Sequence, residues 1–93
     1  MIIEKTETFD KWYYSIKDRK TKAIIDKRLT RLELNNFGDV KSRGDGVSEL
    51  RIHYGAGYRI YFTKCGEIII LLLCGGDKSS QEKDIKKAKE MLK

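Results

Sequence analysis

The sequence contains no proline and no low-complexity run. Segments that link two domains are usually flexible and rich in proline, glycine or polar residues, and no such segment interrupts the chain. Its 93 residues suit one domain, since domains contain roughly 50–250 residues. We therefore expect a single domain over residues 1–93.

Histidine and cysteine are scarce, with one histidine and two cysteines in the whole chain. On a nearly straight chain, the Cα atoms of Cys65 and Cys74 lie far beyond the limit of about 7 Å for a disulfide. With one histidine, a zinc site built from cysteine and histidine is also disfavoured. The sequence predicts two free thiols in a reducing compartment, with no metal and no cofactor.

Long apolar runs are absent too. The longest one extends only from Ile68 to Cys74, whereas a membrane-spanning helix needs about 20 residues. The N-terminal residues do not combine a basic segment with a long apolar stretch, as a signal peptide does. We therefore expect a soluble, cytoplasmic protein.

Charge is abundant and unbalanced. Lysine and arginine outnumber aspartate and glutamate by 20 to 14, which gives a net charge of +6. A small basic domain attracts polyanions, of which nucleic acid is the commonest. A basic composition is equally compatible with a surface that simply carries many lysines.

Apolar periodicity predicts three helices. The first begins near Thr8, where Phe9, Trp12, Tyr13 and Ile16 form one stripe that suits a core better than a platform for stacking bases. The second helix covers residues 20–35 and buries Ile24, Ile25, Leu29 and Leu32, with a stop at Asn35–Gly38. The third begins at Ser79, where Ser79 and Glu82 match a capping box.

Alternation predicts the strands. Residues 2–6 are expected to form a short strand, followed after the two helices by strands at 47–54 and 58–63 and an apolar strand at 68–74, buried on both faces. Residues 39–46 have the composition of a loop, in which Lys41 and Arg43 either hold RNA phosphates or belong to a solvated connector. The order β-α-α-β-β-β-α predicts an α+β fold with a helical hairpin packed on a curved, mainly antiparallel sheet.

A candidate active site lies on the polar face of the central hairpin. Arg51 and His53 alternate on one strand, Arg59 and Tyr61 on the next, and Lys78 follows the third strand close to a helix start. Arginine and lysine can stabilise the extra charge of a phosphorane, and histidine is the natural acid or base. RNA supplies its own nucleophile in the 2′-hydroxyl, so no metal is needed.

Two further residues have expected roles at this site. Tyr61 is expected to stack on a base or to support proton transfer, and Glu49 to orient an arginine. The same pattern of charges also fits a solvated salt-bridge face without catalysis.

Several segments resemble one known family over nearly the whole chain. They begin with Phe9 and Trp12 and continue through Asn36–Asp39, Gly46–Ile52, Gly57–Phe62, Leu72–Gln81 and Asp84–Lys89. In these segments the sequence resembles the phage-derived Gp49-like, HigB-like addiction module killer proteins of the RelE/ParE toxin superfamily. The resemblance implies a toxin that cleaves mRNA in the ribosomal A site, an mRNA interferase, inhibited by a helix-turn-helix antitoxin encoded beside it.

The resemblance also bears on the site residues. Arg51, Arg59 and Lys78 fall where relatives carry basic residues that catalyse or hold RNA. RelE-type enzymes often have several lysines on the central strands and a tyrosine near the C-terminus, whereas this chain has Arg51 and His53 and no such tyrosine. The superfamily includes ParE-like inhibitors of DNA gyrase, so gyrase inhibition and a non-catalytic RNA-binding module remain alternatives.

Overall fold

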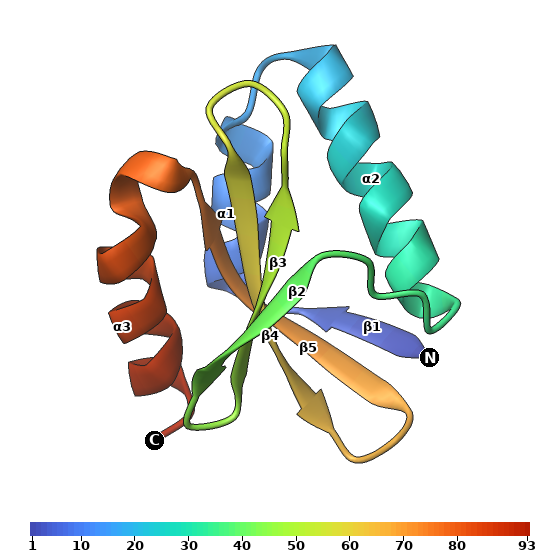
Figure 1. The fold of residues 1–93 in the computed structure, drawn as a ribbon, viewed down its shortest axis with the longest axis vertical. Helices are drawn as coiled ribbons and strands as arrows, with labels where there is room; N and C mark the ends of the chain where they lie inside the picture. The colour runs from blue at the N-terminus through green and yellow to red at the C-terminus, as the bar shows by residue number, and fades with distance from the viewer.

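The computed structural model describes residues 1–93 as a five-stranded sheet with three α-helices and one turn of 3₁₀ helix. Along the chain the elements are β1 (Ile2–Lys5), α1 (Glu7–Ser15), α2 (Arg19–Glu33), β2 (Val40–Gly44), β3 (Val47–Ile52), β4 (Tyr58–Cys65), β5 (Ile69–Gly76), η1 (Lys78–Ser80) and α3 (Gln81–Met91) (Figure 1). The predicted α+β class is confirmed, and most element ends lie within one or two residues of the predicted ones.

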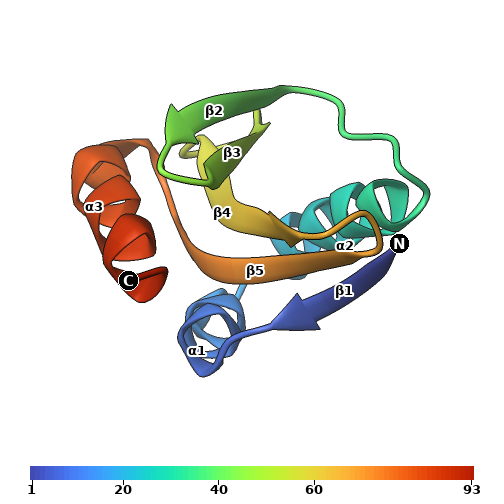
Figure 2. The same ribbon diagram turned by 90° about the horizontal axis from the view of Figure 1, so that it is seen from below.

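The strands form one mixed sheet in the order β1-β5-β4-β3-β2. β1 runs parallel to β5, and every other neighbouring pair is antiparallel. Figure 2 shows how the sheet curves from β2 at one edge to β1 at the other. The apolar strand β5 lies in the interior of the sheet and is buried on both faces, as its composition predicts.

Helices α1 and α2 cover one face of this sheet. Phe9 of α1 and Ile25, Leu29 and Leu32 of α2 pack against alternate residues of the strands. Trp12, Tyr13 and Ile16 lie at the edge of the same core, so the aromatic stripe of α1 is structural and not a stacking platform. The predicted helical hairpin on one face of the sheet is confirmed.

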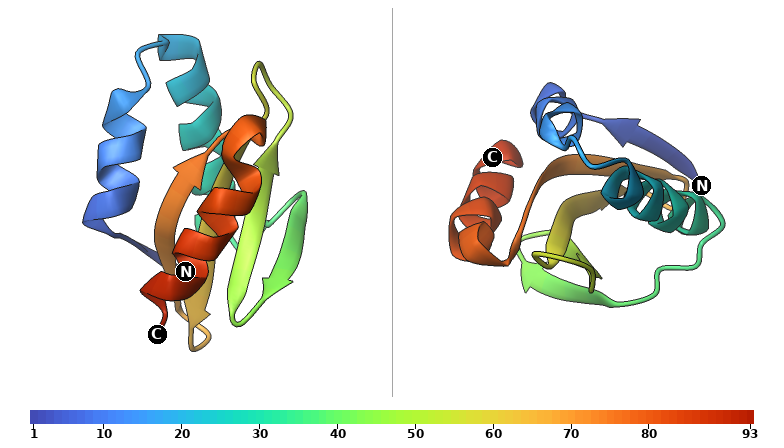
Figure 3. Two further views of the ribbon diagram at one scale, coloured as in Figure 1. Left: turned by 90° about the vertical axis from the view of Figure 1, so that its left-hand side faces the viewer. Right: turned by 90° about the horizontal axis from the view of Figure 1, so that it is seen from above.

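Helix α3 lies apart from α1 and α2 (Figure 3) and packs on the other face of the sheet. A second core forms there from Val47, Tyr61, Leu73, Cys74 and Ala88. The sequence assigned this face to solvent, and for much of β3 and β4 that assignment is wrong. Because α3 covers them, Glu49 and Tyr61 are buried, and Thr63 is buried as well.

Strand β2 occupies most of the segment predicted to be a loop. Val40 pairs with Leu50 and Lys41 with Glu49, and the hairpin turns at Asp45 and Gly46, which both have positive φ. The loop prediction fails because an edge strand pairs on one side only and needs no alternating apolar residues. Lys41 and Arg43 therefore lie on a strand of the sheet.

The helix caps also differ from the predicted ones. Thr6, not Thr8, caps α1, because its hydroxyl accepts a hydrogen bond from the Phe9 amide and donates one to the Leu73 carbonyl of β5. At the other end of the chain, the capping box at Ser79 is not formed. Asp77 instead caps the 3₁₀ turn, and α3 begins at Gln81.

Two adjacent glycines allow helices to pack on both faces of β5. A Cβ at Gly75 would overlap the ring of Trp12 in α1, and a Cβ at Gly76 would overlap the carboxylate of Asp84 in α3. Neighbouring residues of a strand point to opposite faces. The Gly75–Gly76 pair therefore creates room for one helix on each side.

Replacing Gly75 with alanine is expected to destabilise the protein by about 1–3 kcal/mol, the usual range for overpacking a core. Urea denaturation measures the change. The control is the same substitution in a Trp12→Leu background, where the smaller side chain leaves room for the methyl group and most of the loss should disappear. An equal loss in both backgrounds would contradict the assignment to Trp12.

Two further features concern the membrane and the thiols. No helix in the structure has the length and apolar character needed to cross a bilayer. Both cysteines are free: Cys65 ends β4 at the surface, whereas Cys74 is buried in β5 opposite Tyr61.

Candidate functional site

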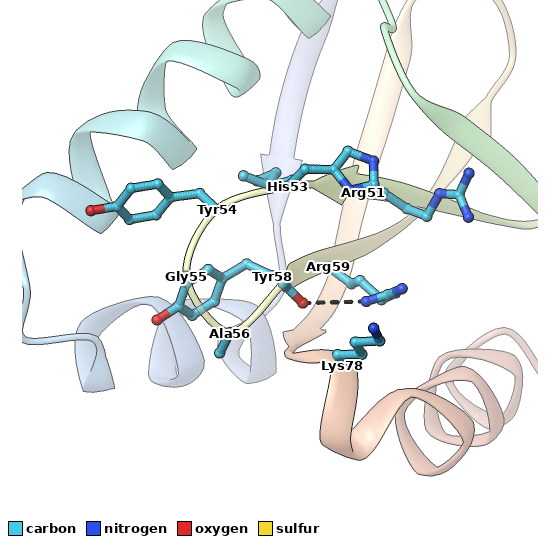
Figure 4. A pocket seen from close by; sticks show the side chains of 10 residues that line it. Arg51, His53, Tyr54, Gly55, Ala56, Tyr58, Arg59 and Lys78 are labelled. Carbon is cyan, nitrogen blue, oxygen red and sulfur yellow. Dashed lines mark hydrogen bonds between the residues drawn. The ribbon is translucent and has the colours of Figure 1, made fainter.

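An open pocket of about 360 Å³ lies at the tip of the β3–β4 hairpin (Figure 4). Four predicted catalytic residues, Arg51, His53, Arg59 and Lys78, line it together with the hairpin residues Ile52 and Tyr54–Tyr58. No carboxylate lines the pocket. The charged side chains of the lining, Arg51, Arg59 and Lys78, are therefore all cationic, and His53 lies beside them.

The two arginines of the pocket lie directly opposite each other. Arg51 of β3 is the register partner of Arg59 of β4. Like charges in this arrangement destabilise a sheet unless anions offset them. A carboxylate lies beside each arginine: Arg51 pairs with Asp39 at 3.0 Å, and Arg59 lies 3.6 Å from Glu49, which also binds Arg43.

Asp39 binds two of the pocket residues at once. One carboxylate oxygen accepts hydrogen bonds from Nε and Nη2 of Arg51, at 3.3 and 3.0 Å. The other lies 2.5 Å from Nε2 of His53. The hydrogen bonds with His53 and then Arg51 lower the pKa of Asp39 and so favour the ionised carboxylate.

Glu49 lies at the centre of a buried polar cluster behind Arg59. Its side chain is fully buried and accepts hydrogen bonds from Arg43 at 2.8 Å and from Gln81 of α3 at 3.1 Å. Burial alone would raise the pKa of Glu49, but the hydrogen bonds from Arg43 and Gln81 outweigh it and the pKa is lowered. The ionised carboxylate thus ties β2, β4 and α3 to β3.

Arg59 connects this cluster to the pocket. Only 12% of its side chain is exposed, and its Nη1 donates to the carbonyl of Gly57 at 3.3 Å. Its Nε is buried without a hydrogen-bond partner. Glu49 faces both Arg43 and Arg59, so the cluster keeps one positive charge in excess beside the pocket.

Lys78 comes from the segment that follows β5. Its backbone N–H lies 3.4 Å from the carbonyl of Ala56, so the segment is attached to the hairpin tip. Gly57 has a φ of +77°, and a Cβ there would lie 3.4 Å from Cβ of Lys78 and 3.7 Å from Nη1 of Arg59. Gly57 therefore lets the two cationic side chains approach each other.

The three residues predicted to bind RNA do not line this pocket. Lys41 is exposed on β2, the edge strand that neighbours β3. The guanidinium of Arg43 is bound to Glu49 instead of lying in a mobile loop, because Arg43 sits at a bulge of β2. Tyr61 is buried beneath α3, so the expectation that it stacks on a base at the surface is wrong.

The hydroxyl of Tyr61 is buried near Glu49 without a hydrogen bond of good geometry, and burial, followed by the charge of Glu49, raises the pKa of this tyrosine. Tyr61→Phe is therefore expected to keep or raise stability by up to about 1 kcal/mol, since it removes an unsatisfied polar group. Urea denaturation tests this. A loss of more than about 1 kcal/mol would show that the hydroxyl donates to Glu49 in solution.

Two residues of the site, Asp39 and Gln81, are not predicted from the sequence. Their partners lie far along the chain: His53 is 14 residues from Asp39, and Glu49 is 32 from Gln81. No local pattern connects residues so far apart.

Comparison with known proteins places the chain in a family. No family model matches the sequence. A Haemophilus influenzae protein, described only as an uncharacterized protein, is 52% identical over 87 residues, which cover 94% of this chain and 88% of that protein. The chain belongs to the family of this Haemophilus protein.

Proposed function

We propose that the protein is the toxin of a type II toxin–antitoxin system and acts as a ribosome-dependent mRNA endonuclease. The observation that carries this proposal is the pocket at the hairpin tip, where Arg51, His53, Arg59 and Lys78 meet without a carboxylate in the lining. Such a lining suits a phosphodiester, which is anionic before cleavage and more so in the transition state.

The residues suggest a division of roles. Arg59 and Lys78 hold the phosphate, and Arg51 adds positive charge from the neighbouring strand. His53 accepts the proton of the RNA 2′-hydroxyl, and the resulting oxygen attacks the adjacent phosphorus. The bond to the 5′-oxygen breaks, and this oxygen takes a proton from water. The products are a 2′,3′-cyclic phosphate and a free 5′-hydroxyl.

The biological setting follows from the resemblance to HigB-like toxins. The ribosome would present mRNA in its A site, so that a small open pocket needs few contacts of its own with RNA. A helix-turn-helix antitoxin would bind the protein and block the basic surface, most simply with an acidic or amphipathic segment. A RelE/ParE-like fold is part of this proposal. The two helices that follow β1 and the antiparallel strands β3, β4 and β5 support it, whereas the edge strand β2 is an addition to the predicted order.

Inducible expression in a bacterium tests the function. Growth arrest with new 5′ ends inside translated codons, found by primer extension and lost when ribosome loading is blocked, is the expected result. Growth arrest with intact transcripts and DNA-damage signalling would point to gyrase inhibition instead. Unimpeded growth would indicate a non-toxic RNA-binding module.

A further inference from the structure

Asp39 is fixed in place by both its backbone and its side chain. Its carbonyl accepts a hydrogen bond from the Arg51 amide at 2.9 Å, and the next residue, Val40, begins β2 opposite Leu50. The carboxylate therefore projects from a paired segment of the sheet. From there one oxygen contacts Arg51 and the other contacts His53.

The contact with Asp39 determines which nitrogen of His53 carries a proton. An ionised carboxylate can only accept hydrogen bonds, so Nε2 of a neutral imidazole must carry the hydrogen. Nδ1 is then unprotonated and can accept a proton. The side chain of His53 is 73% exposed on the pocket wall, so solvent and a ligand can reach it.

We propose that Asp39 is the positioning residue for His53, and this inference rests on the proposed RNA cleavage. Asp39 holds the imidazole against the end of β3 with Nδ1 free to take the 2′-hydroxyl proton. Once that proton has moved, both nitrogens are protonated, and the carboxylate stabilises the imidazolium. A base oriented by a third group is a recurrent arrangement in catalytic sites.

Arg51 takes part in the same arrangement. By occupying the other oxygen of Asp39, it keeps the carboxylate from rotating away from His53. It also offsets the negative charge of Asp39, so that the pocket remains cationic for a phosphate. Asp39 thus serves the pocket without lining it.

The imidazole itself can be observed directly, because His53 is the only histidine in the chain. Nitrogen-15 NMR of the wild-type protein, at a pH where the ring is neutral, should show one tautomer with the proton on Nε2. In Asp39→Asn the two tautomers should mix, because an amide can either accept from Nε2 or donate to it. Identical spectra for the two proteins would overturn the contact on which the proposal depends.

Cleavage of mRNA on ribosomes in a reconstituted translation system tests the role. Asp39→Asn is expected to reduce the cleavage rate by about 100-fold, the lower end of what a general base contributes. If Asp39 acts through His53, the double variant with His53→Gln should be no slower than His53→Gln alone. Asp45→Asn, the same change at an exposed carboxylate of the β2–β3 turn, is the matched control and should cleave at the wild-type rate.

The possible failures can be told apart. A wild-type protein that leaves ribosome-bound mRNA intact would overturn the proposed function, and the role of Asp39 with it. Cleavage by the wild type together with undiminished cleavage by Asp39→Asn would overturn the positioning role alone. Additive losses in the double variant would do the same, since they would show that Asp39 acts independently of His53.

Discussion

Arg59→Ala is expected to lower the rate of RNA cleavage by about 100- to 1,000-fold, the usual effect of removing one donor that stabilises an oxyanion. The guanidinium is held between Glu49 and the Gly57 carbonyl, so it does not have to be ordered when RNA binds. Induced cells should then continue to grow. Primer extension on abundant transcripts and the growth rate measure the effect.

A matched control and a conservative variant keep this result interpretable. Arg31→Ala removes an exposed arginine of α2 and should leave cleavage unchanged. Arg59→Lys retains a charge for Glu49 and should stay folded, yet it loses the planar fork that binds two phosphate oxygens. Full toxicity of a folded Arg59→Ala protein would remove Arg59 from the site.

Glu49→Ala is expected to destabilise the protein by about 3–5 kcal/mol, the usual effect of breaking a buried ion pair from one side. Arg43 and Arg59 would keep their charges in a largely buried position without a carboxylate, and Gln81 would lose its acceptor. Small domains are stable by only about 5–15 kcal/mol, so much of the protein could unfold. Urea denaturation at neutral pH gives the value.

The exposed Glu67, in the turn between β4 and β5, provides the comparison for this substitution. Glu67→Ala should change stability by no more than about 0.5 kcal/mol, as is usual for surface positions. A similar small effect for Glu49→Ala would show that water enters the cluster and replaces the carboxylate.

Acid offers a second test of Glu49. Its pKa is lowered in the folded protein, so the stability it contributes is present above its unfolded value of about 4.3. That contribution is lost as the pH falls through the folded pKa. Glu49→Gln should therefore show a shallower loss of stability below about pH 4 than the wild type.

The sequence predicts elements well where one face is apolar. The stripe that includes Phe9 and the one that includes Leu29 both mark helices that pack on the sheet. The sequence does not predict β2, because this strand lies at the edge of the sheet and is mostly polar. It also fails to predict that Glu49 and Tyr61 are buried, because alternation shows which residues share a face but not what covers that face.

The candidate site, too, is predicted from the sequence only in part. Hairpin register alone brings Arg51 next to Arg59 and leaves His53 nearby, and these residues do line one pocket with Lys78. The contact of Asp39 with His53 depends on the pairing of β2, which the sequence did not predict. Recognising the edge strand would have shown that Asp39 lies beside Arg51.

The arginine, histidine and lysine residues of the pocket all lie between positions 51 and 78, on one hairpin and on the segment whose backbone is hydrogen-bonded to its tip. Helices α1 and α2 pack on the opposite face of the sheet and contribute none of them. The outer surfaces of these helices can therefore change in sequence without altering the residues of the pocket. Within one family, the helical surface and the pocket can evolve at different rates.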